Sequence, residues 1–346
     1  MEIIKNLYKK IGFPRLIITV FLIMFLISAV GLGLSLPDLL TDIINRFGMN
    51  AIMVLAMVPT IQAGTGINLN LALGVIFGLI GALVSMEMGL QGWNSMIVAF
   101  SIAIPLAIIA GYLYGLLMNR IKGQEMTVGN YFGFSIVSLM CIFWLIAPFK
   151  NESLVWAMGG KGLRVTLTLE DSFGSLLNDF LAFKIAGVKI PTGLLLFFAI
   201  CAGLVYLFTN TKTGTALRVS GSGEKFAVSN GLNVDKYRIL SVIISTVLAA
   251  IGIIIYSQAF GFLQLYNAPL YVSMPAAASI LIGGATLKKA TITHVIIGTF
   301  LFQGLLVVAL PVINIVSEGS MAEIIRITIS NGIILYALTR KAGDTA

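Results

Sequence analysis

Residues 239–260 read ILSVIISTVLAAIGIIIYSQAF, a run of 22 residues without a single charged side chain. An α-helix needs about 20 mainly apolar residues to cross the hydrocarbon core of a bilayer, which is about 30 Å thick. The run therefore predicts a membrane-spanning helix and decides the class of the fold. The composition agrees, because 58% of the 346 residues are apolar and only 10% are charged, against roughly 45–50% and 25% in soluble proteins.

Further apolar runs accompany this one along the chain. Seven are long enough to span a membrane, and they cover residues 16–36, 67–86, 95–118, 126–148, 191–208, 291–313 and 322–338. Two shorter runs, 50–63 and 273–287, are flanked by proline and glycine, so we expect broken membrane segments there. The pattern predicts an all-α polytopic membrane protein of about ten segments, built as one transmembrane domain over residues 1–346.

The distribution of Lys and Arg predicts the orientation of these segments. With both termini in the cytoplasm, most of the 22 basic residues fall on inner loops, as the positive-inside rule requires. The basic start of the chain precedes a long apolar run with no signal-peptidase-like site, which favours a retained first span over a cleaved secretory signal. Topology and anionic membrane lipid then account for the net charge of +8, and no nucleic acid partner is expected.

Three pairs of glycines predict close approach between helices, because the members of each pair lie four residues apart. The pairs are Gly74 and Gly78, Gly111 and Gly115, and Gly129 and Gly133. The spacing leaves open whether they pack helices within one subunit or between two.

The outer loop, residues 149–190, carries apolar side chains at helical spacing between Phe173 and Leu181. We expect an amphipathic helix there, capped by Asp171 or Ser172. Two roles stay open for this helix, one flat on the outer membrane face and one as a docking surface for an external partner.

The inner loop, residues 209–238, contains a short stretch enclosed by glycines. Gly221 and Gly223 precede it, the residues from 224 to 230 have the length of about two helical turns, and Gly231 suits a left-handed C-terminal cap. A short helix held along the membrane surface fits a shallow groove on a partner protein. A solvated loop would have the same composition.

Residues 221–234, GSGEKFAVSNGLNV, resemble the coupling loop of permease subunits in binding-protein-dependent ABC importers of the ribose and branched-chain amino acid type. Two further blocks resemble the same family in the same order, 66–70 (GINLN) and 278–287 (ASILIGGATL). Asn68 and Asn70 stand where the family usually has an acid and a serine. This departure from the family pattern affects the expected solute more than the expected class of transporter.

The resemblance implies an alternating-access permease of the bacterial cytoplasmic membrane. It implies as partners ABC ATPase subunits, a second permease subunit (identical or paralogous) and an extracytoplasmic solute-binding protein. ATP and Mg would be bound by the ATPase, since this chain has no G-x-x-x-x-G-K-[ST] motif, and we expect no cofactor and no catalysis here. The residues expected to couple to the ATPase are Gly221, Gly223, Glu224, Lys225, Phe226, Ala227, Gly231 and Asn233.

Uncharged polar residues beside the two short segments mark the expected solute path, because irregular backbone at membrane depth lines a cavity or is buried. These path residues are Gln62, Asn68, Asn70, Gln258, Gln264 and Asn267. The same amides would also serve to bond one helix to another.

A neutral polar path favours an uncharged, hydroxyl-rich solute. We therefore expect a simple sugar first, a nucleoside next and an amino acid third. An autonomous secondary carrier is the alternative class. It would need an ionisable pair deep in the membrane, whereas the one pair in the predicted spans, Glu323 and Arg326, falls at the outer end of the last span, where a structural role is expected.

Overall fold

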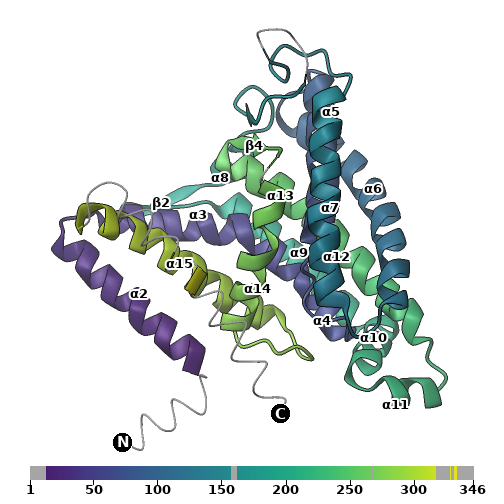
Figure 1. Cartoon of the computed structure of the whole chain (residues 1–346). Helices are drawn as coiled ribbons and strands as arrows, with labels where there is room; N and C mark the ends of the chain where they lie inside the picture. Colours follow the sequence, from purple (N-terminus) through teal and green to yellow (C-terminus); the bar gives the residue numbers. More distant parts are fainter. Residues whose placement is uncertain (1–12, 157–161, 267, 317–327, 329–330, 333–346) are drawn as a thin grey trace, which may run out of the picture.

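The computed structural model describes residues 13–156, 162–266, 268–316, 328 and 331–332. The fold is mainly helical (Figure 1). Its helices are α2 (Phe13–Gly31), α3 (Leu36–Leu55), α4 (Met57–Gln62), α5 (Leu71–Glu87), α6 (Gly92–Arg120), α7 (Glu125–Ile146), α8 (Leu176–Asp179), α9 (Thr192–Asn210), α10 (Lys212–Ser222), α11 (Glu224–Ser229), α12 (Val234–Phe260), α13 (Ala268–Tyr271), α14 (Ser273–Ile282) and α15 (Ile292–Val316). The described strands are β1 (Thr166–Thr168), β2 (Phe183–Ile185), β3 (Val188–Ile190) and β4 (Phe262–Gln264).

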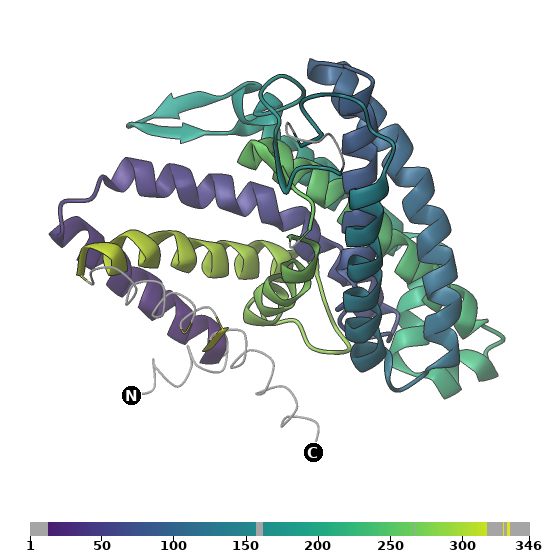
Figure 2. The same ribbon diagram turned by 45° about the horizontal axis from the view of Figure 1, so that its top comes forward.

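The long helices form two groups that run in clearly different directions. Helices α5, α6 and α7 belong to one group and α2, α3 and α15 to the other, as Figures 1 and 2 show. Helix α12 packs against α5 and α6 and also against α3, so it joins the two groups. Helix α14 packs against both α15 and α3.

Glycines determine how closely the first group approaches α12. A Cβ atom added at Gly74 would lie 2.7 Å from the Cβ atom of Ala249, and one at Gly78 would lie 2.5 Å from the carbonyl oxygen of Ala250. The pair at 111 and 115 meets α12 in the same way. These distances leave no room for a side chain, so the glycines permit the close packing. The predicted glycine pairs therefore pack helices within one subunit.

Six helical segments in the described part of the chain are long and apolar enough to cross a membrane, by length and composition. They are Leu36–Gln62, Gly92–Arg120, Glu125–Ile146, Thr192–Asn210, Val234–Phe260 and Ile292–Val316. Three shorter apolar helices, Arg15–Gly31, Leu71–Glu87 and Ala268–Ile282, correspond to further predicted segments. The last predicted segment, 322–338, lies largely outside the described residues. The count of ten and the inner placement of both termini stay predictions.

The prediction of a short segment over residues 50–63 is wrong in its N-terminal limit. Helix α3 begins at Leu36, and α3 and α4 together form a segment of 27 residues. Their only irregularity is at Ala56, three residues before Pro59, whose missing N–H cannot continue the hydrogen-bond ladder. The first predicted span, 16–36, correspondingly ends too late, because α2 ends at Gly31.

A polar stripe explains why hydropathy placed this boundary wrongly. Asp38, Asp42, Arg46 and Asn50 follow one another at intervals of four, which places them on one face of α3. Their charges lower the local hydropathy, so the stretch resembles a loop although the opposite face of the helix is apolar and buried.

The predicted amphipathic helix of the outer loop does not form in this described segment. Helix α8 has only four residues, and its N-cap is Ser175, with neither Asp171 nor Ser172 in the capping position. Ser175 and Leu181 have φ angles of 55° and 54°, which a continuous α-helix does not allow. The apolar side chains of this stretch divide instead, and Phe173 is fully buried in the core whereas Leu181 is exposed.

Short strands complete the outer loop, so the all-α class needs correction. Strand β1 pairs antiparallel with β4, and β2 forms a hairpin with β3. The β1–β4 pair joins the outer loop to the segment that follows α12. Pairing of this kind satisfies backbone groups outside the helices.

Candidate functional site

A cavity of about 420 Å³ lies where α3 and α15 of the second helix group approach α12 and α14. Its walls come from α3, α12, α14 and α15 together with β4 and α13. The polar and aromatic lining residues are Arg46, Asn50, Tyr256, Gln264, Tyr271, Ser279, Phe302 and Gln303, and Met53, Val54 and Leu306 are among the apolar ones. Apolar walls with a few convergent polar groups are typical of a small-molecule site.

Two interrupted helices form much of this cavity. The lining residues of α3 lie just before the irregularity at Ala56. On the other wall, α13 and α14 are separated at Val272, and Pro275 in the first turn of α14 also lines the cavity. Such discontinuous segments are where transporters place their solute sites.

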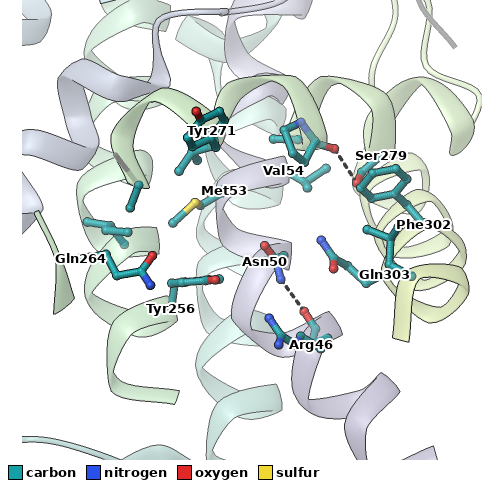
Figure 3. Close-up of a pocket in the computed structure, with 16 residues that line it drawn as sticks. Arg46, Asn50, Met53, Val54, Tyr256, Gln264, Tyr271, Ser279, Phe302 and Gln303 are labelled. Atoms are coloured by element: carbon teal, nitrogen blue, oxygen red, sulfur yellow. Dashed lines mark hydrogen bonds between the residues drawn. The ribbon is translucent and has the colours of Figure 1, made fainter. Parts of the chain in front are cut away.

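The polar side chains face one another across the cavity. Figure 3 shows Asn50 from α3 and Gln303 from α15 pointing toward one another, with Arg46 one turn from Asn50. Tyr256 and Gln264 lie on the other side of the cavity. Residues from four separate parts of the chain are thus able to contact one solute.

Arg46 is the cation in this lining. Its guanidinium carbon lies 5.6 Å from the centroid of the Phe260 ring, within the range of a cation–π contact. None of the ion pairs formed among the described residues includes Arg46, although Asp42 lies one turn earlier on α3. The guanidinium N–H groups are therefore available to a solute.

The predicted path residues reach different places. Gln264 lines the cavity, and Asn267 lies outside the described residues. Gln258 is fully buried, and its Oε1 accepts a hydrogen bond from the Leu177 backbone N–H at 3.1 Å. Its Nε2 donates to Asn178 Oδ1 at 3.3 Å. Gln258 thus attaches the outer loop to the end of α12, away from the cavity lining.

Asn68 and Asn70 lie between α4 and α5 and do not line this cavity. The Asn68 Nδ2 donates to Ser245 Oγ of α12 at 2.9 Å, and its Oδ1 accepts from the Asn70 backbone N–H at 3.1 Å. Asn70 is 1% exposed and packs with the Tyr114 hydroxyl against Gly129 of α7. Asn68 therefore bonds the segment between α4 and α5 to α12, Asn70 packs against α7, and the role of both in a solute path stays a prediction.

Gln62 connects the end of α4 to two other segments. Its Nε2 donates to the Ala290 carbonyl at 2.8 Å, just before α15. The backbone of residues 62–64 lies directly against Gly221 of α10, where an added Cβ atom would be 2.6 Å from the Gly64 nitrogen and closer still to the Gln62 carbonyl oxygen. The inner loop therefore packs without clearance on the segment that carries Arg46.

The short helix predicted for the inner loop is confirmed. Helix α11 covers Glu224–Ser229, Gly223 is its N-cap, and Gly231 follows it with a φ angle of 75°. Phe226 and Val228 are 63% and 58% exposed, whereas Ala227 is fully buried. The helix thus presents apolar side chains outward, as a segment that docks into a groove does. The coupling roles of these residues stay predictions.

The N-terminus of α12 begins beside this helix. Asn233 caps it, because its Oδ1 accepts a hydrogen bond from the Lys236 backbone N–H at 3.1 Å. Lys225 is exposed on α11. The inner loop therefore contains two short helices, α10 and α11, and ends at the N-cap of α12.

Lys122, in the turn between α6 and α7, attaches α11 to the first helix group. Its Nζ lies 2.7 Å from Asp235 Oδ1 and 2.9 Å from Glu224 Oε1. Hydrogen bonds to Asp235 and Glu224 raise the pKa of Lys122 above its usual 10.5. Behind them, Arg238 forms a buried ion pair with Glu125. Glu224 is therefore an internal anchor for α11.

Sequence reasoning missed Arg46, Asn50, Tyr256, Tyr271 and Gln303. The regular spacing of the polar stripe on α3 was the signal that identifies the first two as one face of a helix. The other three had no local signal, because only the packing of α12, α13 and α15 brings them together.

Comparisons with known proteins show what the chain is similar to. The family model described as branched-chain amino acid transport system / permease component matches residues 39–337. The tyrosine transport system permease protein of Clostridioides difficile (strain R20291) is 33% identical over 113 residues, which is 32% of this chain and 38% of that relative. A solved chain described as a metal-chelate type ABC transporter in an inward-facing conformation has a TM-score of 0.45 and 14% identity, covering 94% of this chain and 98% of that one.

Proposed function

The chain belongs to the family of branched-chain amino acid transport system permease components, and from that premise we propose that it is the permease of an ATP-driven importer for an amino acid. As an ABC transporter permease it is a transport subunit, and it is a multi-pass protein of the bacterial cytoplasmic membrane. ATPase partners follow from the family. What we propose beyond the family is that transport is inward, that the solute is an amino acid, and that two further partners take part.

The cavity enclosed by α3, α12, α14 and α15 is the observation that carries this proposal. Its lining contains the cation Arg46 among amide and aromatic side chains. The path is therefore not neutral, and the reason for expecting a simple sugar or a nucleoside is weakened. The family description and the tyrosine permease of Clostridioides difficile also support an amino acid.

Movement of the ATPase would reach this cavity through the inner loop. Helix α11 would dock into the ATPase through its exposed Phe226 and Val228. Helix α10 would transmit the displacement through Gly221 to the end of α4, and the α3–α4 segment carries residues of the cavity wall. A rigid helix transmits such a shift along its length, and the two helix groups would rock to open the cavity to alternate sides.

Two further partners belong to the proposal. A second permease subunit, identical or paralogous, would complete the pathway, and an extracytoplasmic binding protein would deliver the solute to the outer loop, residues 149–190.

The test is purification from native membrane followed by transport in proteoliposomes. We expect an ATPase to co-purify with the chain, and we expect uptake of labelled tyrosine or leucine that requires ATP. Ribose and uridine, assayed in the same vesicles, report the sugar and nucleoside alternatives. Uptake of ribose or uridine but of neither amino acid would refute the proposal that the solute is an amino acid. Uptake without ATP by the chain alone would favour an autonomous carrier.

A further inference from the structure

We propose that Arg46 binds the carboxylate of the solute and that the aromatic lining selects an amino acid with an aromatic side chain. This inference rests on the proposed function and adds the class of amino acid and the residue that recognises it. It starts from the position of a cation on a helix long and apolar enough to cross a membrane. Cations are costly in such helices and usually face a cavity or a partner.

The guanidinium of Arg46 is held in place but not neutralised. Phe260 of α12 lies against it at 5.6 Å, which restricts its orientation. Within the described ranges it forms no ion pair, and Asp42 on the same face of α3 is exposed. A planar guanidinium with free N–H donors matches a carboxylate in a bidentate arrangement.

Asn50 supplies a complementary acceptor one turn further along α3. Its Nδ2 already donates to the Arg46 carbonyl at 2.9 Å, and this bond directs the amide. The Oδ1 atom makes no hydrogen bond among the described residues and faces the cavity beside Gln303 (Figure 3). An ammonium group adjacent to the bound carboxylate would donate to this oxygen. The spacing of one helical turn suits the two charged groups of a single amino acid.

Aromatic side chains provide the surface for the rest of the solute. Tyr256 and Tyr271 line the cavity, and the Tyr256 ring stacks on Phe260 with centroids 5.7 Å apart. Stacked or edge-to-face pairs of aromatic rings contribute free energy beyond the burial of their area, a contribution that an aliphatic side chain does not make. A volume of about 420 Å³ is within the range of cavities that enclose small organic ligands.

The experiment measures binding of tritiated L-tyrosine to the full chain in lipid nanodiscs, together with the subunits that co-purify and without the binding protein. Competitors that each lack one group are tyramine (no carboxylate), 3-(4-hydroxyphenyl)propionate (no ammonium) and leucine (no ring). We expect tyramine and 3-(4-hydroxyphenyl)propionate to compete at least tenfold more weakly than unlabelled tyrosine, because a charge-assisted hydrogen bond contributes about a 10- to 100-fold factor in affinity. Leucine should compete several-fold more weakly, because it loses the contacts between aromatic rings. This arm needs no variant and is independent of folding defects.

Variants then assign the carboxylate contact. Arg46→Gln should weaken tyrosine binding about 10- to 100-fold and remove the preference for tyrosine over tyramine, since neither the cation nor its bidentate donors remain. Arg46→Lys should keep part of that preference. Arg120→Gln, the same substitution at an exposed arginine outside the cavity lining, should leave binding unchanged.

The outcomes separate this inference from the proposed function. Equal competition by tyrosine and tyramine in the wild-type chain, or an unchanged preference in Arg46→Gln, would overturn the role of Arg46. Equal competition by leucine would overturn the aromatic selection. Either result leaves amino acid import intact if ATP-driven uptake persists. Absence of uptake for every amino acid would instead overturn the proposed function, and this inference with it.

Discussion

Replacing Gly221 by alanine should uncouple ATP hydrolysis from transport. The added Cβ atom would lie 2.6 Å from both the Ala63 carbonyl carbon and the Gly64 nitrogen, whereas ordinary contact begins at 3.4 Å. Helix α10 would therefore have to move by at least about 0.8 Å relative to α4, since the obstructing atoms belong to the backbone. Overpacking of this kind costs about 1–3 kcal/mol.

The expected loss of transport follows from this free energy. If uptake requires the state in which α10 packs on α4, a cost of 1–3 kcal/mol lowers the population of that state about 5- to 150-fold. The assay is ATP-driven uptake in proteoliposomes, normalised to the amount of permease in the membrane, with ATPase activity measured in parallel. Uptake should fall by this factor, and ATP hydrolysis should fall less.

Gly223 offers a matched control two residues away. A Cβ atom there meets only the Phe226 Cβ at 3.6 Å, and its φ angle of −167° suits any residue. Gly223→Ala leaves the α10–α4 contact intact, so its uptake should clearly exceed that of Gly221→Ala. Equal uptake by the two alanine variants, or wild-type uptake by Gly221→Ala, would refute transmission through the α10–α4 contact.

Three further predictions concern polar contacts. Lys122→Met should slow uptake modestly, since exposed ion pairs contribute only about 0.2–1 kcal/mol each. Because the pKa of Lys122 is raised in the folded protein, the stability that its ion pairs contribute is complete below pH 10.5 and is lost only as the pH rises through the folded-state pKa. In a pH series, the ratio of wild-type to variant uptake should therefore stay constant from roughly pH 6 to pH 9. Arg238→Met should lower the free energy of unfolding by up to about 3 kcal/mol because the partly buried Glu125 carboxylate loses its cation; adding Glu125→Leu should restore thermal stability in detergent, and failure to do so would contradict the pairing. Gln258→Leu should cost about 1–3 kcal/mol because the Leu177 N–H loses its acceptor, and faster protease cleavage of the outer loop, compared with wild type, measures that loosening.

Local patterns in the sequence were sufficient for the class of the protein and for part of its inner surface. Runs such as 239–260 are apolar over the length of a membrane span, and this property does not depend on any other part of the chain. Gly231 similarly sets the C-terminal limit of α11, because its φ angle of 75° is one that glycine adopts readily. Both features are decided by residues close in sequence.

Hydrophobic spacing was misleading where the apolar side chains of a segment could pack against more than one part of the protein. The stretch from Phe173 to Leu181 has helical spacing, but its apolar side chains pack partly into the protein core and partly outward. The polar face of α3 misled in the opposite direction, because the charges of Asp38, Asp42 and Arg46 lower the hydropathy of a helix to that of a loop. Spacing shows that a face exists, and it does not show what lies against that face.

The tertiary structure alone decided which distant residues meet. Arg46 lies beside Phe260, and Lys122 pairs with Glu224, although each pair is separated by more than one hundred residues. Gly221 contacts residues 62–64 in the same way. Such contacts depend on the angles at which whole helices pack, and these angles arise from the fit of many side chains at once. The sequence therefore determined a membrane permease with a short helix in its inner loop, whereas the packing of α3, α12 and α15 determined where the cavity lies and that an arginine lines it.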